Sequence, residues 1–292
     1  MLPLTDSRKP YPLSFEEQKY LLNELPAYLS DMVLFKVNTG TREQEVCGLR
    51  WDWEVEIPEL NTSVFIIPDK YVKNGDDRLV VLNNIAKSII DKQSDKNPEY
   101  VFTCEGERLG SMNNTTWQRK RILAALKMAR DSNECEYIDI SVVGRYLSLE
   151  WKIRSKRIGE PERVITYTVT DYDKNRLAKG LEPIAGSCRK EPNLKQLMRF
   201  IIIEQFFSRD WPEVEAFSNV RIHDLKHTYG RRLRAVGVHN ETRKALLGHR
   251  NGDITTHYSA AEVEELLEAT ERVCNYDSRK SRTITLLRRK MG

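Results

Sequence analysis

Two short apolar segments restrict the fold of this chain most, because they predict a β-hairpin in a sequence whose other signals are mostly helical. Residues 63–68 (SVFIIP) and 78–83 (RLVVLN) have the composition of strands, and the Asn74-Gly75 pair between them favours a hairpin turn. The pattern predicts a predominantly α chain of the α+β class with a small antiparallel sheet, and it places Lys73 at the hairpin tip.

Helix start and stop signals precede the hairpin. Ser14 and Glu17 have the spacing of a capping box, and Pro26 ends the helix that begins there. We expect the following apolar helix to end at Gly40, since glycine favours the left-handed conformation that terminates helices.

A second capping box predicts a short helix that begins beside an arginine. Thr41 and Gln44 have the required spacing, so Arg42 is expected at the positively polarised start of this helix. A longer helix follows the hairpin and is expected to be capped near Asn113 or Asn114.

Three further helices are expected in residues 220–274, the last of them with an apolar stripe. The residues that mark their limits are Gly237, Asn240, Gly248, Ser259 and Glu262.

Composition divides the chain into three segments. Residues 10–126 and 220–292 share the succession of capped elements and are interpreted as two parts of one domain, the second with a basic C-terminal tail. Residues 127–219 carry sixteen Lys and Arg against fifteen Asp and Glu and contain no chemical motif. Their pattern predicts a strand within residues 162–171 and is consistent with a buried helix at 193–207, so we interpret them as an inserted subdomain.

Positive charge is concentrated in two segments of a chain whose formal net charge is only +4. Residues 220–258 carry eight Lys and Arg against three Asp and Glu, and residues 271–292 carry seven against two. The remainder of the chain is therefore net negative. Two basic segments on an acidic body indicate a localised site for a polyanion, and a solvated charged surface is the alternative for the tail.

Apolar runs and cysteines predict a cytoplasmic protein. No apolar run approaches the ~20 residues of a membrane span, and the N-terminus has no basic region followed by an apolar stretch. The five cysteines are widely spaced and form no CxxC pair, which favours reduced thiols over a disulfide framework or a zinc site. We expect no metal ion or other cofactor.

Candidate functional side chains lie on both sides of the insertion. Cationic groups can bind a phosphodiester whose negative charge grows during nucleophilic attack, and a tyrosine hydroxyl can form a covalent phospho-enzyme. A lysine can protonate a departing sugar oxygen, and a histidine can transfer protons near neutral pH. The candidates are Arg42, Lys73, His223, Lys226, His249 and Tyr258.

The order of these motifs resembles the catalytic domain of the tyrosine recombinases, specifically that of phage-type integrases. The segments that carry the resemblance are TGTREQEVCGLRW, YVKNGDDR, HDLKHT, LLGHR and THYSA, and it covers roughly residues 10–126 and 220–292. It implies site-specific recombination of double-stranded DNA through a covalent 3′-phosphotyrosyl intermediate, with self-association on the DNA. It also implies a bacterial or phage-encoded protein that acts on DNA in the cytoplasm.

The resemblance implies a role for each candidate residue. Tyr258 would attack the scissile phosphate, and Lys73 would protonate the departing 5′ oxygen. His223 would assist proton transfer. The groups that would bind the phosphate are Arg42, Lys226 and His249.

Three departures from the family pattern leave alternatives open. Lys226 stands where the family has a second arginine, whose planar fork can hold two phosphate oxygens. Residues 127–219 replace a link that is usually short, and few residues precede the domain where integrases carry a DNA-clamping domain. The alternatives are a degenerate integrase that binds DNA without efficient cleavage and a nicking and closing enzyme that resembles type IB topoisomerases.

Overall fold

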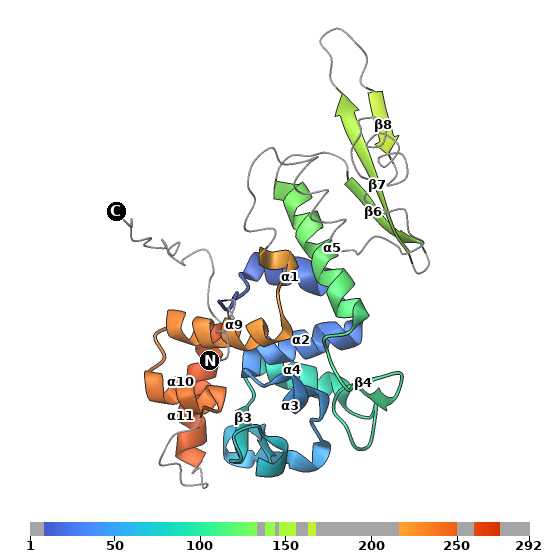
Figure 1. Cartoon of the computed structure of the whole chain (residues 1–292). Helices are drawn as coiled ribbons and strands as arrows, with labels where there is room; N and C mark the ends of the chain where they lie inside the picture. Colours follow the sequence, from blue (N-terminus) through green and yellow to red (C-terminus); the bar gives the residue numbers. More distant parts are fainter. Residues whose placement is uncertain are drawn as a thin grey trace, which may run out of the picture. The chain divides into compact units, whose positions relative to one another are not determined.

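The computed structural model describes residues 9–132, 138–143, 146–155, 163–167, 216–249 and 260–274. Most of these residues are helical, and the strands form small antiparallel sheets, as expected for a predominantly α member of the α+β class (Figure 1). The helix predicted at 193–207 lies outside the described residues.

The chain separates into two compact units. The first unit comprises Met1–Phe15, Ala27–Met112 and Ile222–Gly292, and the second comprises Glu16–Pro26 and Asn113–Arg221. The second unit therefore contains the sequence-predicted insertion together with short segments that precede it.

Helix α2 (Ala27–Thr39) lies at the centre of the first unit. Helices α4 (Asn84–Gln93), α9 (Ile222–Ala235) and α11 (Ala260–Cys274) all pack against it, which explains why its sequence is apolar around most of its circumference. The helix ends at Gly40, whose φ of +65° is the left-handed conformation predicted there.

The three-stranded sheet of the first unit contains the predicted hairpin. Strands β1 (Glu54–Ile57), β2 (Thr62–Ile67) and β3 (Arg78–Val81) pair antiparallel in that order, with Ile67 opposite Arg78 at the end of the hairpin. The connection is longer than a two-residue turn, and Gly75 has a φ of +75° whereas Asn74 is not left-handed. The hairpin is thus confirmed, but the Asn-Gly pair shapes part of a longer loop.

The short helix α3 (Glu43–Cys47) begins one residue later than predicted. Arg42 is its N-cap, and the Arg42 backbone N–H donates to the Glu45 carboxylate over 2.7 Å. The box predicted for Thr41 and Gln44 is therefore wrong. A carboxylate accepts a stronger hydrogen bond than an amide does, and Glu45 also pairs with the Arg42 side chain.

Helix α10 (Asn240–Leu247) shows a similar shift at its start. His239 is its N-cap, whereas the predicted cap, Asn240, accepts a hydrogen bond from Arg243 over 3.0 Å. The helix ends as predicted at Gly248, whose φ is +56°. Gly237 after α9 is also left-handed, with a φ of +76°.

The second unit contains the long helix α5 (Thr115–Ser132) and most of α1 (Phe15–Glu24). Asn114 caps α5 by accepting from the Trp117 backbone N–H over 2.9 Å, in agreement with one of the two predicted caps. The Tyr20 hydroxyl of α1 donates to an α5 carboxylate, that of Asp131, over 2.8 Å.

A second three-stranded antiparallel sheet belongs to the same unit. Its strands are β6 (Ile138–Val143), β7 (Tyr146–Ser155) and β8 (Arg163–Tyr167), paired in chain order. Strand β8 confirms the strand predicted within residues 162–171.

Two negative findings apply to the described ranges only. No helix there is long and apolar enough to cross a membrane. The same ranges contain no group of three or more His, Cys, Asp or Glu side chains arranged to hold a metal ion.

Candidate active site

Arg42 connects three segments of the first unit. Its side chain is 20% exposed, and Nη1 donates to Oε1 of Glu45 over 2.7 Å. Its Nη2 donates to Oδ1 of Asn74 in the hairpin loop over 3.2 Å and to the Gly248 carbonyl after α10 over 3.4 Å. One guanidinium therefore joins the start of α3, the loop between β2 and β3, and the end of α10.

The hairpin loop is held at the same place by its own hydrogen bond. Asn74 Nδ2 donates to the Gly248 carbonyl over 3.0 Å, so Asn74 contacts both Arg42 and the end of α10. The neighbouring Lys73 has an exposed side chain. The structure thus brings the backbone around Lys73 beside the Arg42 guanidinium.

Lys226 is buried rather than presented to solvent. Its side chain extends from α9, the residue is 5% exposed, and Nζ donates to the Leu247 carbonyl over 2.6 Å. Burial, with smaller contributions from the positive charges of Arg78 and Arg42, lowers the pKa of Lys226 to about 7. Lys226 accordingly holds the last carbonyl of α10, immediately before Gly248.

Arg78 and Glu45 form a buried ion pair beneath these groups. The Arg78 Nε lies 3.1 Å from Oε2 of Glu45, and its Nη2 donates to the Leu246 carbonyl over 3.0 Å. Burial alone would raise the pKa of Glu45, but Arg78 and Arg42 outweigh it and hold that pKa below its ordinary value. Glu45 therefore remains ionised and orients both guanidinium groups.

His249 directly follows the left-handed Gly248 at the end of α10. Its backbone N–H donates to the Lys244 carbonyl over 3.0 Å, which fixes the direction in which the chain leaves the helix. Partial burial is the main cause that lowers the pKa of His249, and the positive charges of Lys226 and Arg42 lower it further. The imidazole is therefore neutral at pH 7 and can donate or accept a hydrogen bond.

Two more histidines lie on α9, one turn apart. The His223 and His227 rings form an edge-to-face contact with centroids 4.7 Å apart. Burial is the main cause that lowers the pKa of His223, and the charge of His227 lowers it further. Burial also lowers the pKa of His227. His223 is exposed.

Lys36 is a further cation at this site. It lies in the last turn of α2, is 0% exposed, and its Nζ donates to the Thr41 carbonyl. Burial is the main cause that lowers the pKa of Lys36 to about 7. We refer to five residues of this site as the basic cluster: Lys36, Arg42, Arg78, Lys226 and His249.

The basic cluster is not fully neutralised by carboxylates. Glu45 pairs with both guanidinium groups. Among the described residues, no carboxylate oxygen lies within 4.0 Å of the ammonium of Lys36 or Lys226. Buried positive charge without a paired carboxylate favours the binding of an anion, because a bound anion supplies the missing countercharge.

The sequence-predicted residues are therefore brought together in part. Arg42, Lys226 and His249 converge on the end of α10, Lys73 is adjacent through Asn74, and His223 lies one turn from Lys226 on α9. Tyr258 lies outside the described residues, so its place in the site stays a prediction.

Three residues of the site were not predicted from the sequence, namely Lys36, Arg78 and Glu45. A signal existed for Lys36, because it is the only basic residue within the apolar helix that ends at Gly40. No comparable signal marked Arg78, which has the appearance of an ordinary first residue of a strand.

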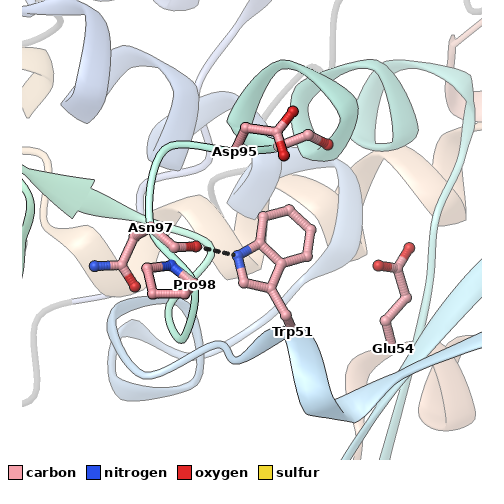
Figure 2. A pocket seen from close by; sticks show the side chains of 6 residues that line it. Trp51, Glu54, Asp95, Asn97 and Pro98 are labelled. Carbon is pink, nitrogen blue, oxygen red and sulfur yellow. Dashed lines mark hydrogen bonds between the residues drawn. The ribbon is translucent and has the colours of Figure 1, made fainter.

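A separate pocket of about 510 Å³ lies elsewhere in the first unit (Figure 2). It is lined by Trp51, whose indole N–H donates to the Asn97 carbonyl over 3.0 Å, and by the carboxylates of Glu54 and Asp95. None of the described candidate residues lines it, and its acidic groups are unsuited to a phosphate.

Comparison with models of known protein families finds no match, and no curated protein sequence matches the chain.

Proposed function

We propose that this chain is a DNA-cleaving and rejoining enzyme of the tyrosine recombinase type, which acts through a covalent 3′-phosphotyrosyl intermediate. One observation carries the proposal: Arg42, Lys226 and His249 meet at the end of α10 in the order of the family motif, although they come from distant parts of the sequence. Strand exchange requires more than one catalytic domain on the DNA, so self-association on duplex DNA is part of the proposal.

The proposed chemistry assigns charge stabilisation to the cluster. The Arg42 guanidinium and the neutral His249 imidazole donate hydrogen bonds to the non-bridging oxygens of the scissile phosphate, where charge develops in the transition state. Tyr258 attacks phosphorus, and the P–O bond to the 5′ sugar oxygen breaks. Lys73 gives that oxygen a proton, and His223 accepts the tyrosine proton.

A second candidate is a protein that binds DNA without efficient cleavage. The Lys226 ammonium is already engaged by the Leu247 carbonyl, and a lysine lacks the fork that would hold two phosphate oxygens. Loss of one charge-assisted hydrogen bond worth roughly 1.5–3 kcal/mol would slow cleavage about ten- to hundredfold. Both candidates share the same DNA-binding surface.

Formation of a covalent adduct separates the two candidates. A labelled random-sequence duplex library that carries strand nicks traps the intermediate, because the short cleaved strand diffuses away before religation. The wild-type chain should yield a protein–DNA band that survives denaturing electrophoresis, and Tyr258→Phe should yield none. A wild-type chain that binds the library but forms no adduct would favour the binding protein, and an adduct in Tyr258→Phe would refute the nucleophile.

Duplex binding should weaken steeply with salt. If the basic segments neutralise about four phosphates, affinity for a fluorescent random-sequence duplex should fall about a hundredfold between about 50 and 200 mM salt, because counterions are released on binding. Fluorescence anisotropy measures the slope. An affinity that is independent of salt would contradict both candidates.

A further inference from the structure

Lys36 has a position that is costly for a charged residue. It lies in the last turn of an apolar helix, it is 0% exposed, and it is among the largest fully buried side chains of the protein. Burial of an ammonium group opposes folding unless other interactions compensate. A role in function would explain why a lysine occupies this position.

Within the part of the chain that the structure describes, the Lys36 ammonium has one hydrogen-bond partner, a backbone carbonyl next to the site. Lys36 Nζ donates to the Thr41 carbonyl, which belongs to the residue immediately before Arg42. The Thr41 hydroxyl is also held, 3.0 Å from the Thr39 hydroxyl. The peptide that leads into Arg42 is therefore fixed on two sides.

Lys36 and Lys226 act on the backbone in matching ways. Lys226 holds the Leu247 carbonyl ahead of Gly248 and His249, as Lys36 holds the Thr41 carbonyl ahead of Arg42. The two carbonyls belong to the two segments that the Arg42 guanidinium joins, through its contact with Gly248.

We propose that Lys36 is a positioning residue of the phosphate site, which fixes Arg42 through the Thr41 carbonyl and adds a second buried ammonium charge beside that of Lys226. The proposal rests on the proposed function, since it needs an anion at the basic cluster. It assigns part of the electrostatic role of the absent arginine to a residue on a different helix. In addition to burial, the positive charges of Lys36 and Lys226 lower the pKa of His223, and that of Lys36 lowers the pKa of Lys226. The same positive charges favour a bound anion.

A purely structural role for Lys36 makes the opposite prediction about stability. If Lys36 served only to stabilise the fold, its replacement by an apolar residue of similar length would lower the thermal unfolding temperature. A lysine retained for its charge should instead be replaceable with a gain in stability, because an apolar side chain suits the apolar surroundings better.

The test compares Lys36→Met with wild type and with Asn38→Ala. Asn38 lies in the same turn of α2, is 3% exposed, and its Oδ1 accepts from Asn83 over 3.1 Å. Thermal unfolding is measured with and without inorganic phosphate, and affinity is measured with a fluorescent random-sequence duplex. Lys36→Leu serves as a second apolar variant.

Lys36→Met should unfold at a higher temperature than wild type, and phosphate should raise that unfolding temperature by less than it does for wild type. The variant should bind the duplex about tenfold more weakly, as expected for one lost charge-assisted interaction. Asn38→Ala should unfold at a lower temperature with unchanged duplex affinity. A Lys36→Met protein that fails to fold, unfolds at a lower temperature or binds the duplex as wild type does would overturn the positioning role. A wild-type chain that binds neither duplex nor phosphate would overturn the proposed function as well.

Discussion

Gly248→Ala is expected to lower the free energy of unfolding by about 3 kcal/mol or more, since it combines backbone strain with a steric clash in the core. Gly248 has a φ of +56°, which costs a residue with a Cβ roughly 1 kcal/mol. An added Cβ would lie 1.7 Å from Nη1 of Arg78. Arg78 cannot withdraw without weakening its ion pair with Glu45, because its side chain is only 1% exposed.

Gly237→Ala is the matched control for this substitution. Gly237 also follows a helix and has a φ of +76°, but an added Cβ there would meet no atom within 4 Å. It should lose only the roughly 1 kcal/mol of left-handed strain. Denaturant unfolding measures the free energy of unfolding of both variants. Equal decreases in the two variants would show that Arg78 moves aside at no cost in free energy.

Stability should rise as the pH increases from about 6 to about 9, because two buried lysines must carry protons at the lower pH. The pKa of Lys36 and that of Lys226 are each about 7 in the folded protein against an ordinary 10.5. Between these values the unfolded chain binds more protons than the folded chain, so the free energy of unfolding increases with pH. The gain should be several kcal/mol, roughly 1.4 kcal/mol per pH unit for each lysine above pH 7.

Denaturant unfolding in buffers across this pH range measures the effect. The range stops at pH 9, because burial raises the pKa of Cys47 to about 11 and its titration opposes the trend above the ordinary value of 9.0. Lys36→Met should remove about half of the slope. A stability that is constant or falls between pH 7 and pH 9 would show that the lysines retain ordinary pKa values.

Helix ends were predictable to the extent that a single residue determines them. Gly40, Gly237 and Gly248 all adopt the left-handed conformation expected of a terminal glycine. The starts at Arg42 and His239 were each missed by one residue. At α3 the Glu45 carboxylate accepts from the Arg42 backbone N–H, which a sequence pattern with Gln44 did not anticipate. At α10 the predicted cap, Asn240, accepts from the Arg243 side chain instead, and His239 makes no side-chain capping hydrogen bond.

The candidate site was predictable where its residues form a recognisable ordered motif, as Arg42, Lys226 and His249 do. The sequence marks Lys36 as the one basic residue of an apolar helix, but it does not identify what Lys36 contacts, since the partner is a backbone carbonyl and any residue provides one. Arg78 reaches the Leu246 carbonyl across 168 residues, and no local pattern encodes a contact of that range.

The hydrogen bond between Arg42 and Gly248 also determines when the site can assemble during translation. Because 206 residues separate these two partners, the ribosome completes α2, α3 and the hairpin long before α9 and α10 emerge. A nascent chain therefore carries only three of the five residues of the basic cluster until α9 and α10 emerge, and contacts of this range form slowly. An unfinished polypeptide would consequently lack the assembled basic cluster, so the proposed anion site forms only after most of the chain has been synthesised.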